Sequence, residues 1–327
     1  MKESIYIHAT KKAWHFTWEH KTLWFFGAFA AFLGQFGIME FLGKVGIQKG
    51  NSGYYLGTFG SVLSQVGNFV ANAGNSYDSK IILFFLLTLI LCIFSIFIFV
   101  SVVSQGLLLY AESQEIKNKK INIVKSWHVG TANFWRLFFL NFFKKIIIAI
   151  MAITVSLSAY GVLLSPSIPN SIFLTLVFIL FGLFGLILSF LFFYSAGYLV
   201  IEKESLSLSI QKAWQMFVGH PVVSFEIGLL ILIFNMFFGV IVALGFILLV
   251  LPAVLIWFAV VLAGGTQIAI SATFVASVIM FTMYILVAGA SFTVFTTYIW
   301  TYTFVEMHGK GIKSVLVNFF RRLRGKK

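Results

Sequence analysis

The chain alternates six long apolar stretches with shorter polar segments, most of them basic. A helix needs about 20 apolar residues to cross the hydrocarbon core of a bilayer, and each stretch reaches that length. We therefore predict an all-α fold, a polytopic transmembrane bundle of six spans. The predicted spans are Leu23–Leu42, Ile81–Tyr110, Phe134–Leu164, Ser171–Ile201, Val222–Leu251 and Thr273–Phe304.

One further apolar stretch, Pro252–Gly265, is shorter than a span. Proline begins it and the pair Gly264-Gly265 ends it, and both residue types interrupt regular structure. We predict a re-entrant or external interfacial hairpin at this position. The number of crossings then stays even, as it must if both ends of the chain lie on one side.

The polar segments are of two kinds. Residues 43–80 are rich in Gly, Asn and Ser and form the predicted external loop. The others are basic, and we expect them at the cytoplasmic surface as interfacial segments and a basic tail: residues 1–22, 111–133, 202–221 and 305–327. The whole chain, residues 1–327, is predicted to be a single integral membrane domain.

The basic residues follow this alternation. Of the 23 Lys and Arg residues, all but Lys44, Lys49 and Lys80 lie in or beside the cytoplasmic segments. An excess of Lys and Arg in cytoplasmic loops is the positive-inside pattern of membrane proteins. It predicts a multi-pass protein of the cytoplasmic (inner) membrane, with both termini in the cytoplasm.

Composition narrows the class of partners. Hydrophobic residues make up 60% of the chain and charged residues 10%, whereas soluble domains carry about 25% charged residues. The net charge of +13 follows the topology, so we expect membrane lipids with anionic headgroups as partners and no nucleic acid. A protein partner or a homo-oligomer is also compatible with these surfaces.

A short motif occurs three times before an apolar stretch. A lysine, a small residue and a tryptophan stand together at Lys12-Ala13-Trp14, Lys125-Ser126-Trp127 and Lys212-Ala213-Trp214. Six residues after each tryptophan is a polar residue that can cap the next helix: His20, Asn133 and His220. Because tryptophan prefers the headgroup level of a bilayer, the repeat predicts three helical hairpins. Each consists of an amphipathic interfacial segment, an outward helix and an inward helix.

Acidic residues extend this repeat. Glu112, Glu202 and Glu306 each lie just past the end of an even-numbered span. Glu226 is different, because it lies about six residues inside the fifth span, where ionisable residues are functional candidates. Its candidate partners are Lys144 and Lys145. This charge cluster has two interpretations: a proton or cation relay, or a salt bridge that joins two hairpins.

The last span carries a polar stripe, in which hydroxyl residues recur every seven positions at Ser277, Tyr284, Ser291 and Tyr298. Such a stripe can line an aqueous path for a solute. Hydroxyl side chains also form modest contacts between membrane helices, of about 0.6 kcal/mol each, so packing is the other interpretation.

The sequence has no recognisable catalytic or metal site. Phosphate-binding, nucleophile-elbow and Cys-x-x-Cys motifs are absent, Asp78 is the only aspartate, and Cys92 is the only cysteine. The six histidines do not have the spacing of metal ligands. We therefore expect no catalytic residues, no metal and no cofactor, and we do not predict an enzyme.

The pattern Ala213-Trp214…Gly219-His220-Pro221, with a weaker copy at Ala13-Trp14…Glu19-His20, resembles a group of uncharacterised prokaryotic six-span membrane proteins. That group is similar to the membrane domain fused to some bacterial glycerophosphodiester phosphodiesterases. The resemblance implies a prokaryotic membrane protein. Because the catalytic barrel of those enzymes is absent here, their hydrolase activity is not implied.

Two functions are consistent with these observations. The first is a membrane module that binds lipid or a partner protein at its cytoplasmic face, as the Lys/Trp repeats indicate. The second is a small-solute transporter or channel that uses the polar stripe and Glu226. Internal repeats fit either function.

Overall fold

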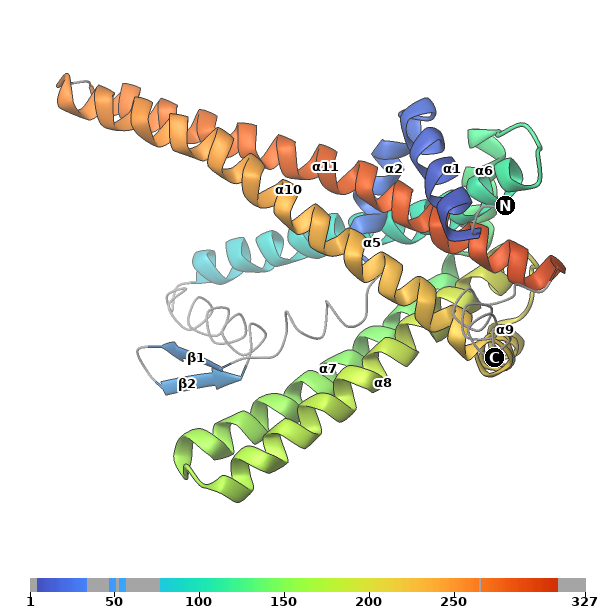
Figure 1. Cartoon of the computed structure of the whole chain (residues 1–327). Coiled ribbons are helices and arrows are strands. Elements are labelled where there is room, and N and C mark those ends of the chain that lie inside the picture. Colours follow the sequence, from blue (N-terminus) through green and yellow to red (C-terminus); the bar gives the residue numbers. More distant parts are fainter. Residues whose placement is uncertain (1–4, 34–46, 51–52, 57–76, 265, 311–327) are drawn as a thin grey trace, which may run out of the picture. The chain divides into compact units, whose positions relative to one another are not determined.

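The computed structural model describes residues 5–33, 47–50, 53–56, 77–264 and 266–310, and helices dominate these ranges (Figure 1). The elements in chain order are α1 (Ile5–Glu19), α2 (Thr22–Ala31), β1 (Ile47–Gly50), β2 (Gly53–Leu56), α5 (Tyr77–Ile116), α6 (Ile123–Ala132), α7 (Phe134–Leu164), α8 (Ile168–Val200), α9 (Leu206–Gly219), α10 (Pro221–Leu262) and α11 (Gln267–Lys310). The two strands pair in antiparallel fashion, with Ile47 opposite Leu56.

Within the described residues, five helices are long and apolar enough to cross a membrane: α5, α7, α8, α10 and α11. The predicted all-α polytopic fold is therefore confirmed, and the chain has the character of a multi-pass membrane protein. The ten-residue apolar helix α2 covers the beginning of the predicted first span. The remainder of that span, from residue 34, lies outside the described residues.

The prediction of a separate hairpin at Pro252–Gly265 was wrong. Helix α10 continues through Pro252 to Leu262, and the chain turns only at Gly264, whose φ of 69° is in the left-handed region. Proline removes one backbone N–H from a helix. Membrane helices tolerate this loss when neighbouring groups satisfy the freed carbonyl, so proline marks a helix end less reliably here than in a soluble protein.

Three helices are about twice as long as a bilayer requires. Helices α5, α10 and α11 have 40, 42 and 44 residues, which at 1.5 Å per residue gives about 60 to 66 Å. The hydrocarbon core is about 30 Å thick. Each of these helices therefore extends beyond the core or crosses it at a strong tilt.

The described residues form two compact units. The first contains α1, α2, the end of α5, most of α6, α10 and α11, and the second contains most of α5, the end of α6, α7, α8 and α9. In the first unit, α11 packs against α1, α2 and α10. Its fully buried side chains include Leu23, Leu107, Ile227 and Val294.

In the second unit, the hairpin of α7 and α8, coloured green in Figure 1, forms the main contact. Ile148, Met151 and Val155 of α7 pack with Leu188 of α8. Helix α5 joins them through an amide pair, in which Asn141 Nδ2 donates to Gln105 Oε1 at 2.7 Å.

Burial in both units is concentrated toward one end of the long helices. In the first unit, the buried residues of α11 begin at Ala290, whereas Phe274 and Met283 are exposed. In the second unit, Leu188 is buried, whereas Ile168 and Leu180 are exposed. Contiguous apolar surfaces of this kind are rare on soluble monomers. The exposed halves of the hairpins therefore have the surface expected of lipid-facing helices.

Two glycines provide a test of the helix packing. A Cβ atom at Gly27 in α2 would lie 2.5 Å from the carbonyl oxygen of Ala290 in α11, whereas a Cβ at Gly182 in α8 has no neighbour within 4 Å. We expect Gly27→Ala to lower the thermal unfolding temperature of the protein in detergent. Gly182→Ala should leave it unchanged or raise it, because alanine is favoured over glycine in a helix by up to about 1 kcal/mol. Equal effects of the two substitutions would contradict the α2–α11 contact.

Candidate functional site

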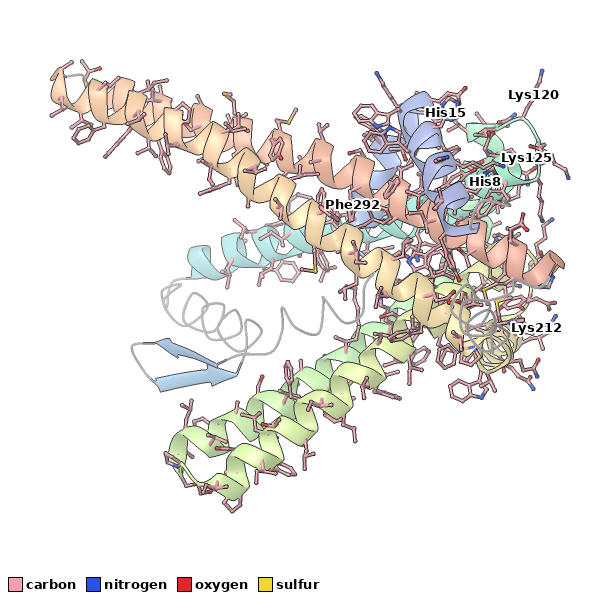
Figure 2. The ribbon with its side chains drawn as sticks, viewed as in Figure 1. His8, His15, Lys120, Lys125, Lys212 and Phe292 are labelled. Atoms are coloured by element: carbon pink, nitrogen blue, oxygen red, sulfur yellow. The ribbon has the colours of Figure 1, made fainter. Side chains whose placement is uncertain are left out.

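The three copies of the Lys/Trp repeat lie on three short helices, α1, α6 and α9. Each precedes the helix of its hairpin that the sequence predicted to run outward: α2, α7 and α10. The labelled Lys125 and Lys212 belong to α6 and α9 (Figure 2). The three repeats therefore occur in the same structural context, although they lie far apart in the sequence.

The small residue at the centre of the repeat is the one that packs. Ala13, Ser126 and Ala213 are each 0% exposed. The tryptophans that follow are more accessible: Trp14 is 61% and Trp214 is 51% exposed, and Trp127 is half-buried beside Phe26, with 5.9 Å between ring centroids. Lys12 and Lys125 are exposed and Lys212 is half-buried. The buried small residue is thus flanked by a lysine and a tryptophan that neighbouring helices cover only in part.

A second small residue lies one turn away in each copy. Ala9 precedes Ala13, Ser209 precedes Ala213, and Gly130 follows Ser126, and all three are buried. Small residues four positions apart let helices approach closely. At Gly130 the approach is visible directly, because a Cβ atom on Gly106 of α5 would lie 3.0 Å from the Gly130 Cα.

Two of the lysines lie over tyrosine rings. Lys12 Nζ of α1 is 5.6 Å from the ring centre of Tyr302 in α11, and Lys212 Nζ of α9 is 6.0 Å from that of Tyr198 in α8. Lys212 also forms an ion pair with Glu204. Tyr302 lies four residues before Glu306, and Tyr198 lies four residues before Glu202. Both glutamates follow an even-numbered predicted span. Two of the three copies therefore include a tyrosine partner that the sequence pattern did not indicate.

Helix α1 is held against α11 by a row of aromatic contacts. Phe16 packs on Tyr298 with 4.6 Å between ring centroids, and His8 contacts the edge of Tyr302 at 6.1 Å. Trp14 meets Phe295 edge-on at 6.3 Å. The predicted interfacial helix is therefore part of the packed first unit. Tyr298, assigned to the polar stripe from the sequence, contributes to this aromatic row.

The predicted capping interactions were wrong. Asn133 and His220 do occupy the N-cap positions of α7 and α10, but neither side chain makes a cap hydrogen bond. Asn133 Nδ2 instead donates to the carbonyl of Val129 in the preceding helix, and His20 Nδ1 lies 3.3 Å from the Phe16 carbonyl. Each of these carbonyls also accepts the backbone N–H of the same residue, so the two side chains contact the end of the preceding helix and not the start of the next.

The candidate charge cluster is divided between the units. Lys144 is buried and Lys145 half-buried on α7 in the second unit. Glu226 belongs to α10 in the first unit, where it accepts a hydrogen bond from the Tyr6 hydroxyl of α1. The pairing of Glu226 with either lysine stays a prediction. Tyr6 is a partner that no spacing in the sequence indicated.

Three hydroxyls of the predicted polar stripe bond to backbone carbonyls. Ser277 and Ser291 donate to Thr273 and Ala288 within α11. Tyr284 donates across the hairpin to the Ile241 carbonyl of α10 at 2.7 Å. Its ring lies directly against Gly245, where any Cβ atom would overlap it. These contacts favour packing over an aqueous path.

A buried carboxyl group joins α5 to α11. Glu112 is 0% exposed, and its Oε2 accepts a hydrogen bond of 2.7 Å from the Thr301 hydroxyl. Among the described residues, no hydrogen-bond partner of Oε1 is present. The sequence shows Glu112 at the same place in the repeat as Glu202 and Glu306. It does not indicate that Glu112 is buried, because the equivalent Glu202 is exposed and Glu306 is half-buried.

An apolar groove runs between α1, α10 and α11, with a volume of about 700 Å³. Trp14 and Trp18 of α1, Phe234 and Phe238 of α10, and Phe292 of α11 are among the residues that line it. A smaller cavity of about 360 Å³, lined by Tyr6 and Glu226, shares Leu230 and Phe234 with the groove.

The Glu112–Thr301 contact can be tested by removing its hydroxyl. Thr301→Val keeps the shape of the side chain but leaves the buried carboxyl without this donor, which costs about 1–3 kcal/mol in other proteins. We expect a corresponding fall in unfolding free energy in detergent, and Thr301→Ser should retain most of the stability. A Thr301→Val protein as stable as the parent would show that the hydrogen bond contributes little.

The chain was compared with protein-family models, curated proteins and solved structures, and none of them matches it.

Proposed function

We propose that this chain is a non-enzymatic module of the cytoplasmic membrane that binds anionic lipid headgroups through α1, α6 and α9. The observation that carries the proposal is the shared arrangement of the repeat: a fully buried small residue flanked by a lysine and a tryptophan, each of which is exposed or half-buried. Tryptophan at the headgroup level and lysine beside phosphate are the expected positions of these side chains at a membrane surface.

The distribution of charge and burial supports this orientation. The packed ends of the hairpins lie beside the basic helices α1 and α9, and the opposite ends expose large apolar side chains. The positive-inside pattern supports a cytoplasmic position for the basic ends and both termini. The proposed resemblance to the membrane domain of bacterial glycerophosphodiester phosphodiesterases agrees with a module that lacks its own catalytic residues.

The alternative, a solute path along α11, receives less support. A path needs polar groups that face water, and the hydroxyls of Ser277, Tyr284 and Ser291 already donate to backbone carbonyls. Proteoliposomes distinguish the two functions directly. Solute flux that is lost in Tyr284→Phe or Glu226→Gln would favour the path.

The proposed function predicts a lipid preference that depends on the repeat lysines. We expect the protein to unfold at a higher temperature in nanodiscs of phosphatidylglycerol than in those of phosphatidylcholine. Changing Lys12, Lys125 and Lys212 to Gln should reduce this difference, because each basic residue near an anionic surface contributes up to about 1 kcal/mol. Lys212 should contribute least, since it is already paired with Glu204.

The matched control also replaces three lysines, but on the predicted external side of the membrane. Lys44, Lys49 and Lys80 lie in the predicted external loop, outside the repeat, so their replacement by Gln should reduce the lipid preference less than replacement of the repeat lysines. If both triple variants behave alike, or if the parent shows no preference for phosphatidylglycerol, the proposed function is incorrect.

A further inference from the structure

The groove between α1, α10 and α11 is lined mainly by aromatic and aliphatic side chains, as a binding site for a hydrocarbon chain would be. Its volume of about 700 Å³ lies within the range of about 300–1,000 Å³ that is typical of small-ligand pockets. A peptide helix is about 10–12 Å in diameter, so a space of this volume holds little more than one turn. The groove is therefore too small for a helix from a partner chain but suits a flexible chain.

The polar groups of the groove leave few interactions for a water-soluble ligand. Four hydroxyl side chains line it, and each already donates within the protein. Thr10, Thr17 and Ser291 donate to helix carbonyls at 2.7 to 3.0 Å, and Tyr6 donates to Glu226. What remains for a ligand is mostly aromatic and aliphatic surface.

The charge of the groove is concentrated at its rim. Among the described residues that line it, Lys11 carries the one charge, and its side chain is exposed. Trp14 and Trp18, also on the lining, are exposed by 61% and 46%. A lysine beside tryptophans at the opening of an apolar groove complements a ligand with an anionic head and a hydrocarbon tail.

The position of the groove agrees with entry from the bilayer. It follows α10 from Leu230 to Ile241, a distance of about 17 Å along the helix axis. This segment leads from the buried Ile231 to the exposed Phe237 and Ile241. The groove thus lies where the packed end of the hairpin passes into its lipid-facing half.

We infer that the groove binds one acyl chain of an anionic phospholipid from the cytoplasmic leaflet, with the phosphate beside Lys11. The inference rests on the proposed function for the orientation of α1. It goes further, because it assigns a defined site to one lipid molecule, whereas the repeat lysines act on the membrane surface as a whole.

Native mass spectrometry of the delipidated protein tests this inference, with dioleoyl phosphatidylglycerol as the probe. One lipid should be retained per chain, more tightly than dioleoyl phosphatidylcholine. Ala288→Trp places a large ring in the groove and should weaken binding at least tenfold. The control Ala276→Trp adds the same ring at an exposed position of α11 that does not line the groove, and it should bind like the parent.

Lysine substitutions separate the groove from the general surface. Lys11→Gln should weaken phosphatidylglycerol binding about fivefold, the effect of one basic residue at an anionic surface, and should leave phosphatidylcholine binding unchanged. The triple variant of Lys12, Lys125 and Lys212 should keep the retained lipid. If that variant loses its lipid preference in nanodiscs while Ala288→Trp binds normally, the proposed function stands and the groove assignment fails.

A labelling experiment keeps the test valid if Ala288→Trp does not fold. In a Cys92→Ser background, a cysteine substituted for Ser291 lines the groove, and one substituted for Ser277 lies outside it. Phosphatidylglycerol should slow maleimide labelling at position 291 and leave position 277 unaffected. Equal protection of both positions, or protection at 291 that phosphatidylcholine matches, would overturn the inference.

Discussion

The close approach of helices at one small residue determines what each repeat presents to the membrane. Because Ala13, Ser126 and Ala213 are fully buried, the rotation of α1, α6 and α9 is fixed, and the neighbouring lysine and tryptophan stay partly or fully accessible. A larger residue at the same position would separate the helices and change which face is exposed. The electrostatic character of this surface therefore depends on van der Waals packing.

The same packing explains why the chain needs a bilayer. Side-chain burial is concentrated at the ends of α10 and α11 beside α1 and at the ends of α7 and α8 beside α9, and the remaining helix surface is apolar and exposed. In water this surface would be strongly unfavourable, whereas lipid tails are as apolar as leucine. The protein contacts and the lipid thus stabilise different parts of each hairpin.

Hydropathy predicted the positions of the long helices well because a span needs about 20 consecutive apolar residues, but α5, α10 and α11 extend beyond the predicted spans. It failed where the outcome depends on tertiary contacts. Pro252 was taken as a helix boundary, but α10 continues through it. Asn133 and His220 were expected to cap the helix ahead of them, and neither does. Glu112, Glu202 and Glu306 look equivalent in sequence, but only Glu112 is fully buried. What distinguishes Glu112 is its contact with Thr301, which is distant in the chain, so no local sequence pattern indicates it.

The contact between α1 and α11 has a consequence for the order of events during synthesis. Phe16 and Tyr298 are about 280 residues apart, yet their rings pack together. At 5–20 residues per second, the ribosome needs roughly 15 to 60 s to add this length of chain. During that time α1 has no α11 to cover Ala9 and Ala13. Its basic and aromatic side chains can hold it at the bilayer surface meanwhile, so α1 is made long before it reaches its final neighbours.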